Sequence, residues 1–140
     1  MRRLPIFVAL AVLPLFLLAC GELVNNGTAG AQIVSLTLEP NTISLSDTGM
    51  TDEYFTVTLV TGGFVDPVDP ETAVVFIQEP ERTEAEPGTR EVSGNTITLG
   101  MIAKSWFAGL EPGVYNIGAE VSSETEQVRQ LDLATVTVEE

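Results

Sequence analysis

The sequence predicts an all-β domain, a sandwich of about seven antiparallel strands. Apolar and polar residues alternate in short runs from residue 32 onward, as expected of strands with one buried face. No window of helical length carries the apolar stripe of an amphipathic helix. Turn-forming residues interrupt the runs roughly every 8 to 15 residues, a spacing typical of sandwiches.

The first strand is expected to be split in two. Apolar residues alternate with polar ones over Val34–Leu38, with Val34 on the apolar face, and the pattern resumes at Ile43. Pro40 and Asn41 stand between the two parts, and both residue types interrupt strands.

The central strands have the clearest patterns. Phe55–Leu59 alternates with threonines, which predicts a strand with one face in the core. Ala73–Ile77 is continuously apolar and lies between Pro70 and Pro80. A continuous run of this length predicts a central strand covered on both faces.

A hairpin is predicted farther along the chain. Arg90–Val92 and Asn95–Met101 flank Ser93 and Gly94, a plausible turn pair. Three residues are expected on the buried face of the second arm: Ile97, Leu99 and Met101.

The last two strands differ in regularity. Tyr115–Val121 alternates cleanly, whereas the apolar parity of the final strand changes between Leu133 and Ala134. A shift of one residue turns a strand's apolar set to the other face, so we expect a β-bulge near this step.

The segment Phe107–Tyr115 resembles the approach to the penultimate strand of immunoglobulin-like and fibronectin-like domains. Pro112 and Gly113 would form the turn, and Tyr115 would occupy the tyrosine-corner position, with its ring buried and its hydroxyl bonded to upstream backbone. The Cys, Trp, Cys core of antibody domains is absent from the sequence. The resemblance therefore implies a disulfide-free, immunoglobulin-like β-sandwich.

Composition excludes several classes of function. The chain has no histidine and one cysteine, which removes the usual catalytic triads, Cys/His pairs and zinc sites. We expect no enzymatic activity and no cofactor. Without Arg2 and Arg3, the chain has four basic and twenty acidic side chains, and this net charge of −16 argues against nucleic-acid binding.

Residues 1–19 have the pattern of an export signal. Arg2 and Arg3 precede the uncharged apolar run Leu4–Ala19, whose 16 residues are short for a membrane span. The run ends in Leu17-Leu18-Ala19-Cys20, followed by Gly21. These residues resemble the lipobox of bacterial lipoproteins.

The resemblance implies that Cys20 becomes the first residue and carries a diacylglycerol thioether, often with a third acyl chain on its amino group. Two or more chains make an effectively permanent anchor. In that family an aspartate after the cysteine favours inner-membrane retention in enteric bacteria, and Gly21 stands there instead. An outer membrane is therefore expected if the source has two membranes.

This division assigns residues 1–19 to the signal, 20–31 to the lipidated cysteine and a flexible tether, and 32–140 to the folded domain. The tether assignment follows from small and turn-forming residues without sustained periodicity.

Two groups of residues are candidates for a binding site. Asp66, Asp69 and Glu71 lie within one acidic loop and could donate oxygens to calcium. Their spacing is not that of an EF-hand, and a solvated loop is the favoured explanation. Trp106 and Phe107 could form a platform for a glycan or a partner, or they could close one end of the sandwich.

These observations together predict a membrane-anchored envelope lipoprotein whose non-catalytic module has a structural or protein-binding role. The partner would be another envelope protein, and the membrane would be reached through the lipid on Cys20. The alternative is a module that binds a small ligand, either calcium or a glycan.

Overall fold

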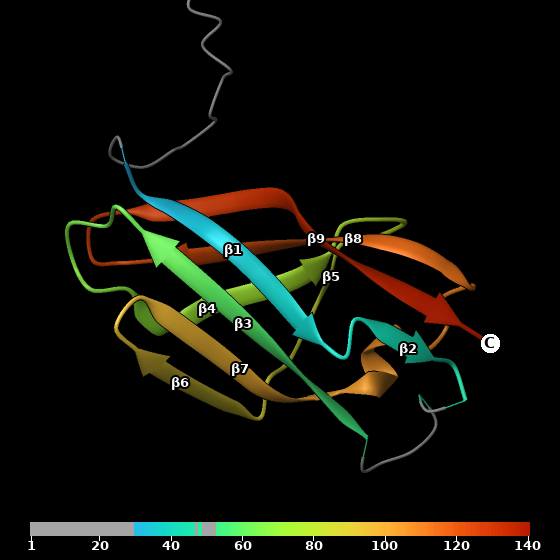
Figure 1. Cartoon of the computed structure of the whole chain (residues 1–140). Coiled ribbons are helices and arrows are strands. Elements are labelled where there is room, and N and C mark those ends of the chain that lie inside the picture. Colours follow the sequence, from blue (N-terminus) through green and yellow to red (C-terminus); the bar gives the residue numbers. More distant parts are fainter. Residues whose placement is uncertain (1–29, 47, 49–52) are drawn as a thin grey trace, which may run out of the picture.

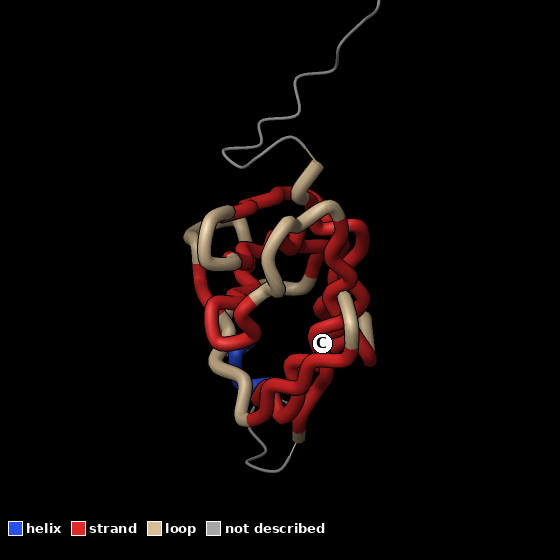
Figure 2. The backbone as a smooth tube through the Cα atoms, turned by 90° about the vertical axis from the view of Figure 1, so that its left-hand side faces the viewer, coloured by secondary structure: helices blue, strands red, loops and turns tan. Residues whose placement is uncertain are grey.

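The computed structural model describes residues 30–46, 48 and 53–140. These residues form two β-sheets packed face to face (Figure 1). Viewed toward the ends of the strands, the sheets lie on either side of a common interior (Figure 2). In the described part of the chain the only helix is a 3-10 turn, η1 (Lys104–Phe107), so the all-β prediction is confirmed.

The described residues form nine strands, seven of them long and two very short. The first sheet has the order β1 (Gln32–Glu39), β3 (Tyr54–Gly62), β7 (Thr96–Ala103), β6 (Thr89–Ser93). The second has the order β2 (Thr42–Ser44), β9 (Gln127–Glu139), β8 (Gly113–Ser122), β4 (Asp69–Ile77), β5 (Thr83–Glu84). The long strands thus follow the ABED and CFG order of an immunoglobulin-like sandwich.

The predicted split of the first strand is confirmed, and the two parts lie in different sheets. β1 pairs with β3, whereas β2 crosses over and pairs in parallel with β9. Pro40 and Asn41 form the crossing, and the Asn41 carbonyl accepts a hydrogen bond from Thr137 N at 2.9 Å. One segment therefore ties the two sheets together.

The predicted inward position of Val34 is wrong. The register between β1 and β3 shifts between Ile33 and Ser35, so Val34 has no partner in the ladder. The bulge places Ile33 in the core and leaves Val34 57% exposed.

Met101 is a second correction of the same kind. Gly100 and Met101 together stand opposite Thr56 of β3, so β7 has a β-bulge of one extra residue here. Met101 adopts a left-handed backbone with φ +53 and is 52% exposed. Ile102 takes the buried position instead.

The bulge predicted in the last strand is present over residues 131–133 rather than at the step from Leu133 to Ala134. These three residues of β9 face the single residue Gly118 of β8. Because the two extra residues preserve parity, Val128 and Val136 both face the core, and Leu131 is exposed. Leu133 and Ala134 both pack against the core, so only the inward position expected of Leu131 is wrong.

The hairpin between β6 and β7 is also confirmed, with its turn one residue later than predicted. Ser93 pairs with Thr96, so Gly94 and Asn95 form the two-residue turn. Gly94 has φ +61, a left-handed backbone conformation that glycine adopts without steric cost.

The core lies between the sheets and is formed by the inward faces of the long strands. Full burial of each large apolar side chain contributes about 1.5–3 kcal/mol relative to exposure. The largest fully buried members of this core are Phe55, Phe107, Ile33, Ile43, Leu59, Ile77, Ile97, Leu99, Ile102, Ile117 and Val57.

The tyrosine corner is present. The Tyr115 hydroxyl donates a hydrogen bond to the Glu111 backbone carbonyl at 2.7 Å, directly before β8. The ring is half-buried rather than fully buried as predicted, because one side of it lines a surface cleft. The bond therefore fixes the chain where it enters the second sheet.

Removal of this hydroxyl tests the corner. In a chain beginning at Gly30, Tyr115→Phe should lower the free energy of unfolding by about 0.5–1.5 kcal/mol, the usual contribution of a neutral hydrogen bond. Glu111→Gln is the control, since it leaves the accepting carbonyl in place and should cost little. Urea denaturation curves with equal midpoints for both variants would contradict a stabilising corner.

Candidate functional site

The described structure begins at Gly30, so the signal, Cys20 and most of the tether lie outside the described residues. Ala31 is already fully buried. Gly30 packs against Gly63 so closely that a side chain at Gly63 would collide with the Gly30 carbonyl. The chain therefore reaches the domain at the end that carries the β3–β4 loop (Figure 1).

The three acidic candidates at this end have separate partners. Asp66 Oδ2 accepts a hydrogen bond from the Thr125 hydroxyl at 2.6 Å, and Asp69 Oδ1 accepts one from Glu71 N at 3.0 Å. Glu71 Oε2 lies 3.6 Å from Arg90 Nη1. Within the described ranges, no three acidic side chains are grouped as a metal ion would require.

Glu126 is a buried carboxylate that sequence reasoning missed. It lies at the end of the β8–β9 hairpin, is 4% exposed, and accepts a hydrogen bond from Val65 N at 2.8 Å through Oε2. A glutamate in a polar turn predicts exposure, and its partner is 61 residues away, so no local signal could have revealed it. Glu126 holds the β3–β4 loop against the hairpin.

Trp106 and Phe107 lie at the opposite end of the sandwich, in η1. Phe107 is fully buried and belongs to the core, and Trp106 packs against that core half-buried. The Trp106 ring stacks on Phe55 with centroids 5.8 Å apart and planes 11° apart, and Phe107 lies 5.3 Å from Phe55. The three rings close this end of the interior.

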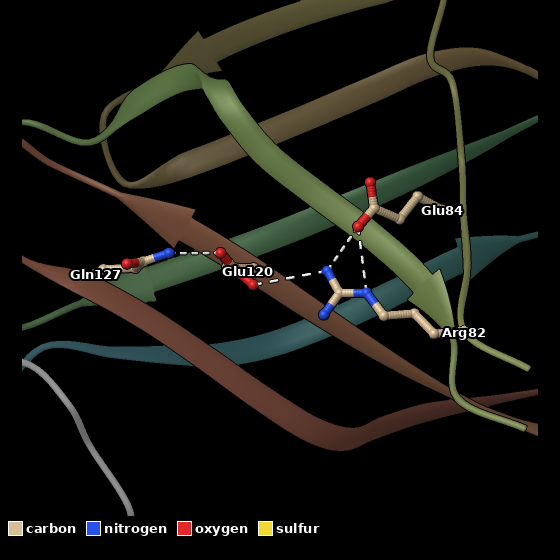
Figure 3. A network of polar contacts seen from close by, with 4 residues as sticks. All are labelled: Arg82, Glu84, Glu120 and Gln127. Carbon is tan, nitrogen blue, oxygen red and sulfur yellow. Dashed lines mark hydrogen bonds and ion pairs between the residues drawn. The ribbon is translucent and has the colours of Figure 1, made fainter.

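The outer face of the second sheet carries a polar network centred on Arg82 (Figure 3). The Arg82 Nη2 and Nε atoms donate to Glu84 Oε1 at 2.7 and 3.2 Å, and Nη2 lies 3.7 Å from Glu120 Oε2. Gln127 donates from Nε2 to Glu120 Oε1 at 2.5 Å. The network links the segment around β5 to β8 and β9.

Beneath this network lies Phe76, which is 1% exposed although it points away from the core. The Arg82 guanidinium carbon lies 4.1 Å from the ring centroid, and that of Arg129 lies 5.4 Å away. Both guanidinium groups lie within cation–π distance of the ring and shield it from solvent. The ring rests on Gly118, so β4 is covered on both faces there, as its continuous apolar run predicts.

A surface cleft of about 810 Å³ lies on the second sheet, at the end far from Gly30. Its walls are the turn after β4, the corner before β8 and the bulge of β9. Gln78 and Asp132 form a reciprocal clasp across it: Gln78 Nε2 donates to Asp132 Oδ1 at 3.1 Å, and Asp132 N donates to Gln78 Oε1 at 2.6 Å. The clasp joins β4 to the bulge over the intervening strand.

Comparisons with known proteins found no matching family model, no matching curated protein and no matching solved structure. Among the helices of the described residues, none has the length and apolar character needed to span a bilayer.

Gly118 offers a test of the packing beneath the network. A Cβ at this position would lie 2.6 Å from Phe76 Cε2 and 3.0 Å from the Gln130 carbonyl oxygen. Gly118→Ala should therefore destabilise a chain beginning at Gly30 by about 1–3 kcal/mol in urea denaturation.

Gly113→Ala on the same strand is the matched control, because its nearest new neighbour would be 3.9 Å away, an ordinary contact. It should change stability little. A loss at Gly118 no larger than that at Gly113 would show that the ring does not require the glycine.

Proposed function

We propose that the protein is a lipid-anchored bacterial envelope lipoprotein whose immunoglobulin-like domain is a non-catalytic structural or protein-binding module. The observation that carries this proposal is the lipobox-like sequence Leu17-Leu18-Ala19-Cys20-Gly21 at the end of an export signal. A diacylglycerol on Cys20, with or without a third chain, supplies enough buried methylene groups for a stable anchor.

The tether and the domain fit such an anchor. Nine residues lie between Cys20 and Gly30, and a flexible chain of those ten residue steps has an end-to-end distance of roughly 17–19 Å. The domain is thus held close to the membrane but is free to turn. Its far end, where β8 begins and β9 ends, points away from the point where the tether joins it (Figure 1).

The fold supports a binding or structural role for the domain. A sandwich with a continuous apolar core is a rigid platform, and its loops and outer sheet face are the surfaces available to a partner. Asp66 is bonded to the β8–β9 hairpin, Asp69 to the Glu71 backbone, and Glu71 is paired with Arg90. Phe55 stacks on the Trp106 ring. These contacts favour protein contact over a calcium or glycan site.

Replacement of Cys20 by serine tests the anchor. Wild-type protein should be processed to begin at acylated Cys20 and should partition into the detergent phase on Triton X-114 separation. Cys20→Ser should remain unprocessed or enter the aqueous phase. Mass spectrometry of the N-terminal peptide identifies the acyl chains.

Gly21→Ser is a suitable control, since it changes a neighbouring small residue and keeps the thiol. If Cys20→Ser protein is still processed and stays tightly membrane-bound, the lipoprotein assignment is wrong.

A further inference from the structure

The cleft at the far end of the second sheet is the candidate for the contact surface. It is bounded by Gln78–Pro80, Gly109–Glu111, Val114–Asn116 and Asp132, residues far apart in the chain. It lies at the opposite end of the strands from Gly30, because β8 begins there and Ser122, at the other end of β8, pairs with Asp69. A partner could reach it without obstruction from the tether.

The cleft carries three uncompensated negative charges. Glu79, Glu111 and Asp132 come from three separate segments, and none forms an ion pair with another described residue. Arg82, Arg90 and Lys104 are paired with acids elsewhere, and the guanidinium of Arg129 lies over the Phe76 ring rather than in the cleft. The cleft itself contains no basic side chain, so it attracts a cationic group and repels an anionic one.

The cleft also presents apolar surface beside these charges. Val114 is 67% exposed, and Pro80 and Leu110 line the same hollow. An aliphatic stem can lie on this surface while its charged end reaches the carboxylates. The surface is therefore complementary to a long basic side chain with apolar neighbours.

The clasp makes part of the surface preorganised. Asp132 is held by two hydrogen bonds to Gln78, with its backbone at φ +53, and its Oδ2 atom makes no hydrogen bond within the described residues. Asn116 adds an amide with both a donor and an acceptor. Because Asp132 is already held in place, binding of a ligand costs less conformational entropy at this residue.

We propose that this cleft is the protein-binding surface of the domain and takes a partner segment that carries a lysine or arginine next to apolar residues. The inference rests on the proposed function, since it names the contact surface of that module.

The test uses full-length lipoprotein purified in detergent and a random heptapeptide phage library. Three proteins are panned in parallel: wild type, a cleft variant (Glu79→Gln, Glu111→Gln, Asp132→Asn) and a control variant (Glu81→Gln, Glu86→Gln, Glu91→Gln). Both variants lose three charges, but the control acids are exposed and lie outside the cleft. Fluorescence anisotropy then measures the dissociation constant of the most enriched peptide for each protein.

Wild type and the control variant should enrich basic, partly apolar peptides and bind the selected peptide equally. The cleft variant should bind it about tenfold more weakly, because the basic side chain loses the attraction of three exposed carboxylates. Val114→Ser should weaken binding without changing its salt dependence. Circular dichroism of each protein checks that it is folded.

Equal weakening in both triple variants would show non-specific attraction to an acidic protein and would overturn the proposal. Enrichment of acidic or uncharged peptides, or no enrichment, would do the same. The anchor is measured separately by detergent partition of Cys20→Ser, so failure at the cleft leaves the lipoprotein assignment intact.

Discussion

Burial of the inward side chains between two sheets is the constraint on which the rest of this domain depends. The chain has one cysteine, so no internal disulfide can contribute to stability, and the sheets are held by packing and by their hydrogen-bonded ladders. The long strands therefore present apolar faces to the interior, with the exception of the edge strand β6, whose residues are exposed or half-buried. Bulges in β1, β7 and β9 meet this requirement where the sequence departs from strict alternation.

Local patterns were sufficient to predict the regular strands. In β3 and β8, apolar residues alternate with polar or small ones over Phe55–Leu59 and Tyr115–Val121, and the structure places these apolar faces inward. The exposure of Val34, Met101 and Leu131 was harder to predict, because each of these apolar residues lies at a bulge and points to solvent. A bulge depends on the register of the neighbouring strand. Such register is a long-range property that alternation alone does not encode.

The surfaces were less predictable than the strands. Glu79, Glu111 and Asp132 are separated by 32 and 21 residues in the sequence, and they meet only because β4, β8 and β9 are neighbours. Asp66, Asp69 and Glu71 are close in sequence, yet their carboxylates are directed to different partners. Proximity along the chain was thus a poor guide to proximity in space. Arg82 is a further example, since its guanidinium lies over the ring of Phe76, a contact that its position in the sequence does not reveal.

The pairing of β1 has a mechanical consequence for a protein held at two ends. If the tether pulls at the start of β1 while a partner holds the far end of the sandwich, the load runs along the strand axes. Antiparallel hydrogen bonds lie across that direction, so the seven residue pairs between β1 and β3 are sheared together rather than opened one after another. The parallel pairing of β2 with β9 then adds a second ladder in series. A small domain without a disulfide could in this way transmit tension between a membrane and its partner while it remains folded.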